Sequence, residues 1–135
     1  MTREEILNLE PGPELDWLVA EKVMGRKRTT KGALPGCAYW KDDDGFVRAN
    51  ETPGGSLNWN PSTDIAAAWE VVKEVRRKGW SLVLRWSARY DLCEVWMDDG
   101  ARKVYAIEPE PTLAICRAAL FTTVEAPHSK TKEEV

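Results

Sequence analysis

One stretch of the chain decides the fold: Asn58-Trp-Asn-Pro-Ser-Thr-Asp64 leads directly into Ile65-Ala-Ala-Ala-Trp-Glu-Val-Val-Lys-Glu-Val-Arg-Arg-Lys-Gly79. Apolar residues recur in the second half at three- and four-residue spacing, which predicts an amphipathic helix that packs on a core. The face expected to be buried comprises Ile65, Ala68, Trp69, Val72 and Val75. The polar and aromatic residues before this helix make its N-terminal mouth the first candidate for a ligand site.

The ends of this helix carry ordinary capping signals. Ser62 is the expected N-cap, and Asp64 places a negative charge in the first turn, where the helix dipole favours it. Gly79 follows a basic last turn and ends the helix.

Composition limits the classes of protein that fit. The chain has 135 residues, 43% of them hydrophobic and 30% charged, which is typical of one globular domain. No apolar run approaches the roughly 20 residues that cross a bilayer, so we expect no membrane-spanning segment. The N-terminal residues include no apolar segment typical of a secretion signal, so we expect an intracellular protein. The net charge of −3 argues against general nucleic-acid binding. Seven Trp favour buried cores and subunit interfaces, hence a homo-oligomer.

The first half of the chain predicts helices followed by a long connection. Thr2 and Glu5 form a capping box, and a second helix runs over 13–24 until Gly25. Residues 26–60 form a long loop that contains a two-stranded ribbon, with strands at 37–41 and 46–49 around an Asp-Asp-Asp-Gly turn.

The second half predicts a sheet and a last helix. Strands at 80–86, 92–97 and 102–107 alternate apolar and polar residues and form an antiparallel meander, and Thr112 caps a helix over 112–124. We therefore expect the α+β class: a single domain over 1–125, built as an α-β-α sandwich around a mostly antiparallel sheet, with helices divided between its faces. Residues 126–135 are expected to be a disordered tail.

Catalytic and metal-binding motifs are not recognisable. Cys37, Cys93 and Cys116 lack metal-ligand spacing and are interpreted as buried free thiols, while His128 is alone in a polar tail. The Asp clusters lie in Asp-Gly turns, where Asp is favoured for local hydrogen bonding. We therefore expect neither an enzyme nor a cofactor.

Three blocks together resemble a known family. They are Leu18-Val-Ala-Glu-Lys-Val-Met-Gly25, Ser62-Thr-Asp-Ile-Ala-Ala-Ala-Trp-Glu-Val-Val72 and Pro111-Thr-Leu-Ala-Ile-Cys-Arg-Ala-Ala-Leu120, and they are similar, in this order, to the phage ABA-sandwich domain family. Residues 26–57 depart from that pattern. The resemblance implies a small bacteriophage protein with an α-β-α sandwich, located in the cytoplasm of the infected bacterium. By analogy, it suggests a sponge that sequesters a nucleotide signal of host immunity.

The helix mouth offers groups that suit such a nucleotide. The backbone amides of Ser62, Thr63 and Asp64 are candidates for a phosphate. Asn58 and Asn60 could hydrogen-bond a ribose or base, and Trp59 could stack on the base. Asp64 would repel a phosphate placed directly beside it. The alternative is an ordinary capped helix against which Trp59 packs.

Three further groups of residues are candidates. Arg85 and Arg89 lie beside Trp86 and Tyr90, so guanidinium and aromatic groups come together, although surface charge explains them equally well. Trp40, with Tyr39 and Arg48, could close over a ligand as a lid; the alternatives are packing at an edge strand or a dimer contact. A basic segment at 26–28 would suit a polyphosphate or simply be a charged loop.

These features lead to two hypotheses of function. The first is a non-catalytic phage protein that sequesters a small anionic nucleotide, such as a cyclic nucleotide or a cyclic ADP-ribose derivative, and so counters host antiphage defence. The second is a protein-interaction module that binds a host or phage protein directly through its Trp-rich surface.

Overall fold

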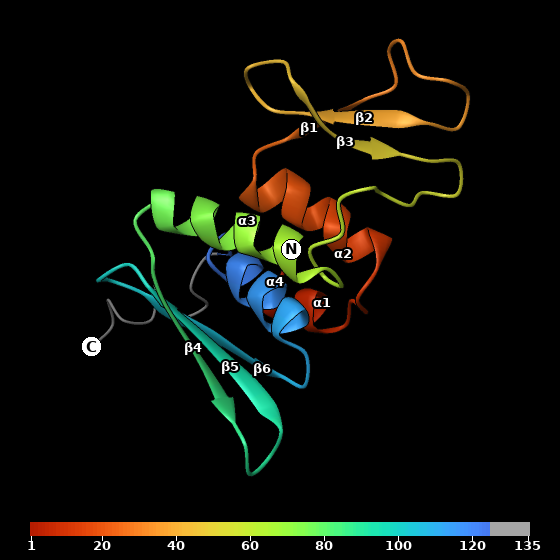
Figure 1. Cartoon of the computed structure of the whole chain (residues 1–135). Helices are drawn as coiled ribbons and strands as arrows, with labels where there is room; N and C mark the ends of the chain where they lie inside the picture. Colours follow the sequence, from red (N-terminus) through yellow and green to blue (C-terminus); the bar gives the residue numbers. More distant parts are fainter. Residues whose placement is uncertain (125–135) are drawn as a thin grey trace.

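The computed structural model describes residues 1–124 as four α-helices, one π-helical turn and six strands (Figure 1). The expected tail at 126–135 lies outside the described residues. The elements, in chain order, are α1 (Arg3–Leu7), α2 (Pro13–Leu18), η1 (Val19–Val23), β1 (Lys27–Thr29), β2 (Ala38–Lys41), β3 (Val47–Glu51), α3 (Ile65–Arg77), β4 (Ser81–Ser87), β5 (Leu92–Asp98), β6 (Lys103–Glu108) and α4 (Pro111–Phe121).

The N-terminal helices follow their sequence signals. Thr2 and Glu5 form the predicted capping box, with each side chain accepting a hydrogen bond from the other residue's backbone amide. The second predicted helix is confirmed, although its last turn, η1, is π-helical. It is followed by Gly25, whose positive φ of 69° suits glycine.

The predicted ribbon gains a third strand. The turn after Asp42 reverses the chain between β2 and β3, and β1 pairs antiparallel with the other edge of β2. These strands form a sheet of their own instead of joining β4–β6. Trp40 and Ala49 on its inner face belong to the same core as the helices, so the domain has one continuous core.

Two details of α3 differ from the prediction. The N-cap is Asp64, whose side chain accepts from the Ala66 amide at 3.2 Å, because the first helical residue is Ile65 and not Thr63. The buried face is rotated, so that Ile65 and Trp69 are about half exposed. The buried residues are Ala67, Ala68, Val71, Val72 and Val75. Small side chains on this face allow close packing against α4 and η1.

The predicted meander is confirmed. Leu82, Met97 and Val104 are opposite one another across β4–β5–β6 and face the helices. Helix α4 packs on β5, β6 and α3. Its cap differs from the prediction: Glu110 is the N-cap and makes no side-chain cap bond, and Pro111 occupies the first helical position, which proline favours.

The α+β class and the antiparallel sheets are confirmed. The helices form layers between the two sheets, with β1–β3 on one side and β4–β6 on the other (Figure 1). Within residues 1–124 no helix covers the outer face of β4–β6, where Val83 is 61% exposed, so the helices are not divided between its faces as expected. No helix in this range is long and apolar enough to cross a membrane.

Candidate functional site

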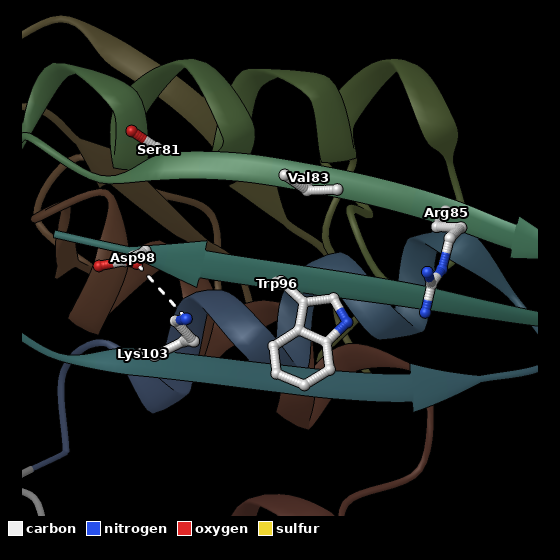
Figure 2. Close-up of a pocket in the computed structure, with 6 residues that line it drawn as sticks. All are labelled: Ser81, Val83, Arg85, Trp96, Asp98 and Lys103. Atoms are coloured by element: carbon white, nitrogen blue, oxygen red, sulfur yellow. Dashed lines mark ion pairs between the residues drawn. The ribbon is translucent and has the colours of Figure 1, made fainter. Parts of the chain in front are cut away.

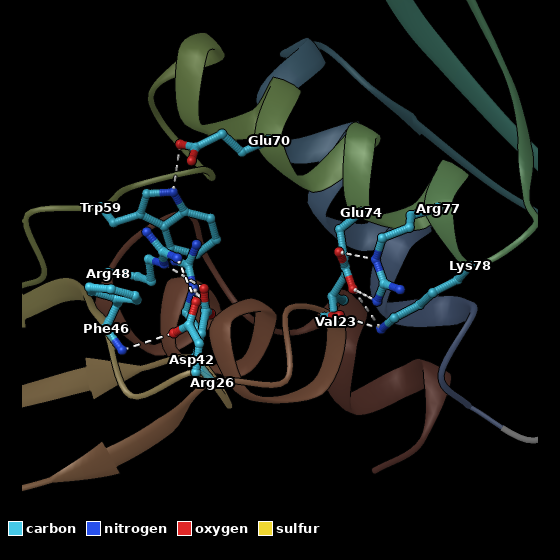
Figure 3. Close-up of polar contacts among 11 residues, drawn as sticks. Val23, Arg26, Asp42, Phe46, Arg48, Trp59, Glu70, Glu74, Arg77 and Lys78 are labelled. Carbon is cyan, nitrogen blue, oxygen red and sulfur yellow. Dashed lines mark hydrogen bonds and ion pairs between the residues drawn. The ribbon is translucent and has the colours of Figure 1, made fainter.

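Trp59, the aromatic residue of the predicted helix-mouth site, is part of the core. Its side chain is only 6% exposed, and its indole Nε1 donates to Glu70 Oε2 at 2.9 Å. The guanidinium of Arg26 lies over the ring, 4.3 Å from the centroid (Figure 3). This ring face is therefore occupied by the protein itself, and Trp59 packs as the alternative interpretation expected.

The amides predicted to receive a phosphate are also occupied. Ser62 N donates to Asp16 Oδ1 at 2.9 Å. Thr63 N and Asp64 N both donate to the Asn60 carbonyl, at 3.1 and 2.7 Å. An anion would have to break these bonds, one of which is to a buried carboxylate. The three amides predicted to receive a phosphate are therefore not free to do so.

The remaining polar groups of the mouth connect neighbouring segments. Asn58 Oδ1 accepts from the Asn50 amide at 2.7 Å, and Ser62 Oγ accepts from the Gly12 amide at 3.0 Å. Burial raises the pKa of Asp16, although the hydrogen bonds from Ser62 act in the opposite direction. The mouth of α3 is thus a junction that joins the helix to the α1–α2 connection and to β3.

Trp40 packs in the core shared by the β1–β3 sheet and the helices and is not free to close over a ligand as a lid. It is buried, and its Nε1 donates to Glu51 Oε1 at 3.2 Å. Arg28 binds both oxygens of the same carboxylate, at 2.7 Å each. These hydrogen bonds, first that of Arg28, lower the pKa of Glu51 against the opposing effect of burial. Trp40 and Arg28 also line a cleft of about 680 Å³ next to α2.

Arg85 lies on a different surface from Trp59 and Trp40. It projects from the outer face of β4 into an open hollow of about 410 Å³ (Figure 2). The residues that line this hollow are Ser81, Val83, Arg85, Trp96, Asp98 and Lys103. Arg89 follows β4 in the turn toward β5, where its guanidinium lies 5.4 Å from the Tyr90 ring centroid, and it does not line the hollow.

The hollow combines an aromatic surface with two cationic groups. Trp96 stacks on Tyr105 with ring centroids 4.6 Å apart, and its Nε1 donates to Glu94 Oε1 at 3.1 Å. Arg85 Nη2 donates to the same oxygen at 2.9 Å. The hydrogen bonds from Trp96 and Arg85 lower the pKa of Glu94. At the other end of the hollow, Lys103 Nζ lies 3.9 Å from Asp98 Oδ2.

Sequence reasoning missed Trp96 and Lys103 as site residues. A signal was present: the two turns of the meander, between β4 and β5 and between β5 and β6, fix the antiparallel register, and period-two alternation then places Arg85, Trp96 and Lys103 on one face. That this face stays open could not be read from alternation, because it depends on which side the helices pack.

Two of the three cysteines are buried. Cys93 and Cys116 are buried, as predicted, and burial raises the pKa of both thiols. Cys37 is only partly buried. Across residues 1–124, no group of three or more His, Cys, Asp or Glu side chains is placed to hold a metal ion.

Comparison with known proteins agrees with the architecture. The chain is similar in fold to a phage protein from Bacillus cereus ATCC 14579, known from a 2.0 Å crystal structure, with a TM-score of 0.58 and 17% sequence identity. The match covers 84% of this chain and 92% of that one. No curated protein matches the chain significantly. The model of the phage ABA sandwich domain matches residues 17–120, which is most of the chain, so the protein belongs to the phage ABA sandwich domain family.

Proposed function

We propose that this phage-family protein is a non-catalytic binding protein that captures a small anionic nucleotide on the outer face of β4–β6. The observation that carries the proposal is the grouping of the Trp96 indole with Arg85 and Lys103 around one open hollow. A nucleotide needs an aromatic surface for its base and cationic donors for its phosphates, and this hollow has both. The helix mouth is not the site proposed, because Trp59 and the three amides predicted to bind phosphate already have partners.

The two cations are available to a ligand although both have acidic neighbours. The Arg85 side chain is 70% exposed and uses one terminal nitrogen for Glu94, so its other donors face solvent. The Lys103–Asp98 contact is long and exposed, and pairs of that kind contribute about 0–1 kcal/mol. A phosphate group of the ligand could therefore bind at either cation at little cost. The Ser81 hydroxyl lies in the same hollow and could bind a ribose hydroxyl.

Capture without cleavage would make the protein a sponge. On this proposal the ligand is a nucleotide signal of host defence, such as a cyclic nucleotide or a cyclic ADP-ribose derivative, and capture takes place in the cytoplasm of the infected bacterium. The volume of about 410 Å³ is in the range of small-molecule sites.

The test is a thermal-shift screen with cyclic nucleotides, cyclic ADP-ribose isomers and NAD, followed by calorimetry on any hit. Arg85→Ala and Trp96→Leu are expected to weaken binding at least tenfold. Arg76→Ala and Trp69→Leu are matched controls, because these exposed side chains lie on α3 away from the hollow. Heat denaturation should release the ligand intact. Binding that is insensitive to Arg85→Ala would overturn the assignment, and a cleaved product would indicate an enzyme.

A protein-interaction module is the second candidate, and it is favoured by the apolar character of the same face. Val83 on β4 and Tyr105 and Ile107 on β6 are each more than 40% exposed on this face, and exposed apolar patches mark interaction surfaces. The partner would be a host or phage protein, or a second copy of the chain. Two results together would favour this function over the sponge. None of the nucleotides tested would shift the melting temperature, and a protein partner would bind the wild type but not the Val83→Glu variant.

A further inference from the structure

A second cleft lies between α2–η1 and the β1–β3 sheet, distinct from the hollow on β4–β6. Its volume is about 680 Å³, and it is walled by the indoles of Trp17 and Trp40 and by Leu18. Three charged side chains line it: Glu14, Glu21 and Arg28. The volume is in the range of sites for small organic molecules.

The helix places the two carboxylates at opposite ends of one apolar surface. Glu14, Trp17, Leu18 and Glu21 follow the spacing i, i+3, i+4 and i+7, which puts them on one helix face. Seven residues of helix correspond to a rise of about 10 Å. An elongated ligand along α2 would therefore meet a carboxylate at each end and aromatic or aliphatic carbon between them.

The charge of Arg28 is already balanced within the protein. Its two hydrogen bonds to Glu51, both 2.7 Å long, neutralise the guanidinium, and Trp40 Nε1 donates to the same carboxylate. Because Glu51 is buried, removing Arg28 from it would leave an uncompensated charge. Arg28 is therefore poorly suited to an anionic ligand, unlike Arg85.

The two glutamates are not balanced in this way. Among the described residues Glu14 has no ion-pair partner within 4.0 Å, and Glu21 contacts only Lys22 at 3.6 Å, in a pair that is about half exposed. Even when the α-amino group of Met1 at the cleft is counted, carboxylates are in excess. Trp rings add an attraction for cations through their electron-rich faces. The excess of carboxylates favours a positively charged ligand, and the aromatic and aliphatic lining favours one with a long carbon chain.

Trp17 is held in place for this role. The edge of its six-membered ring packs against Gly55, at which an added Cβ would lie 3.0 Å from Trp17 Cζ2. The glycine has a positive φ of 89°. The ring is thus fixed between α2 and the loop after β3, and the cleft wall is preformed.

We infer that this cleft binds a linear aliphatic polyamine, with a terminal amine at each of Glu14 and Glu21 and the carbon chain along Trp17 and Leu18. Spermidine is long enough to reach both carboxylates, whereas putrescine is too short to do so in one pose. This site is independent of the proposed nucleotide site.

Isothermal titration of the full chain with spermidine tests the inference. Saturable binding is expected, accompanied by a change in Trp fluorescence, with putrescine at least tenfold weaker. The Glu14→Gln/Glu21→Gln double variant should weaken spermidine binding at least tenfold. The matched control is Glu4→Gln/Glu10→Gln, which removes the same charge from exposed positions outside the cleft and should bind as the wild type does.

Several results would overturn the inference. An equal loss in the control variant would mean that spermidine is attracted only by net negative charge. Absence of saturation at millimolar spermidine, or equally tight binding of a neutral sugar such as glucose, would also reject a polyamine site. Arg85→Ala should leave spermidine binding unchanged, so failure here is distinguishable from failure of the nucleotide proposal. Far-UV circular dichroism of each variant confirms that it is folded.

Discussion

The guanidinium of Arg26 lies over the indole of Trp59, 4.3 Å from its centroid (Figure 3). Arg26 is 5% exposed and its Nε donates to Asp42 Oδ1 at 3.3 Å, which connects the end of η1 to the ribbon turn. The basic segment and the aromatic ring were both candidate ligand-binding groups in the sequence. In the structure, they contact each other instead. The pair fixes β1–β3 against the helix layer.

Replacing Arg26 with Met is expected to lower the free energy of unfolding by about 1–3 kcal/mol. The variant keeps the apolar contact with Trp59 but loses the cation–π attraction and one ion pair of Asp42. Urea denaturation monitored by Trp fluorescence measures the change. Arg76→Met is the control, because Arg76 is exposed on α3, and it should change stability by less than about 0.5 kcal/mol. Equal stability of the two variants would show that the Arg26–Trp59 contact is not stabilising.

Asp16 gives a prediction on pH. Burial raises its pKa in the folded state, so the folded protein binds a proton more readily than the unfolded chain. Its contribution to stability is therefore greatest below the ordinary Asp pKa and decreases as pH rises through the raised value. The stability of the wild type relative to Asp16→Asn should accordingly fall as pH rises above the ordinary Asp pKa of about 3.9. Denaturant titrations of both proteins at several pH values test this, and the opposite slope would contradict it.

Asp16→Ala should cost more than Asp16→Asn. The Asn carbonyl can keep the hydrogen bond from the Ser62 amide, whereas Ala leaves that buried donor without its partner. The expected difference in unfolding free energy is about 1–3 kcal/mol. The same denaturant titrations at pH 7 provide the measurement.

Glu51 is predicted to respond to pH in the opposite direction. The hydrogen bonds from Arg28 and Trp40 lower its folded-state pKa, so its stabilising contribution is present above the ordinary Glu pKa and is lost as pH falls through the lowered value. Glu51→Gln should lower the melting temperature at pH 7, and the gap to the wild type should close on acidification. A gap that widens in acid would be inconsistent with this carboxylate acting through its charge.

Gly55→Ala and Gly54→Ala separate backbone strain from packing. Both glycines have positive φ, which costs an L-residue about 1–2 kcal/mol, but only at Gly55 would the added Cβ meet Trp17. We expect Gly55→Ala to be the more destabilising of the two in thermal unfolding. It should also weaken spermidine binding, because it displaces the Trp17 ring. Similar melting temperatures and affinities for both variants would indicate that Trp17 adjusts freely.

Thr63→Ala should leave nucleotide capture unchanged, within about twofold, even though Thr63 was a candidate from the sequence. The amide of this residue already donates to the Asn60 carbonyl, and its side chain makes no hydrogen bond within residues 1–124. Calorimetry on this variant beside Arg85→Ala tests whether the Thr63 side chain contributes to binding. A loss only in Thr63→Ala would return the site to the helix mouth.

The sequence by itself determined most of the secondary structure, because the signals are local. The Thr2 capping box, the period of α3 and the Asp-Gly turn after β5 each act within a few residues, and each is present in the structure. The sequence also determined the family, because the family model matches residues 17–120. The rotation of the α3 buried face was not predicted, because Ile65 and Trp69 share the apolar stripe and only the packing of α4 and η1 decides which part of it is covered.

Only the tertiary structure decided where a ligand could bind. The partners that occupy the helix mouth come from distant parts of the chain: Asp16 binds Ser62 across 46 residues, and Arg26 reaches Trp59 from the end of η1. Local patterns cannot reveal such partners, because they depend on how the helices and both sheets pack. The same packing leaves Arg85, Trp96 and Lys103 on an open face, and it encloses Trp17 with Glu14 and Glu21 in a cleft. The residues were visible in the sequence, but their availability is a property of the fold.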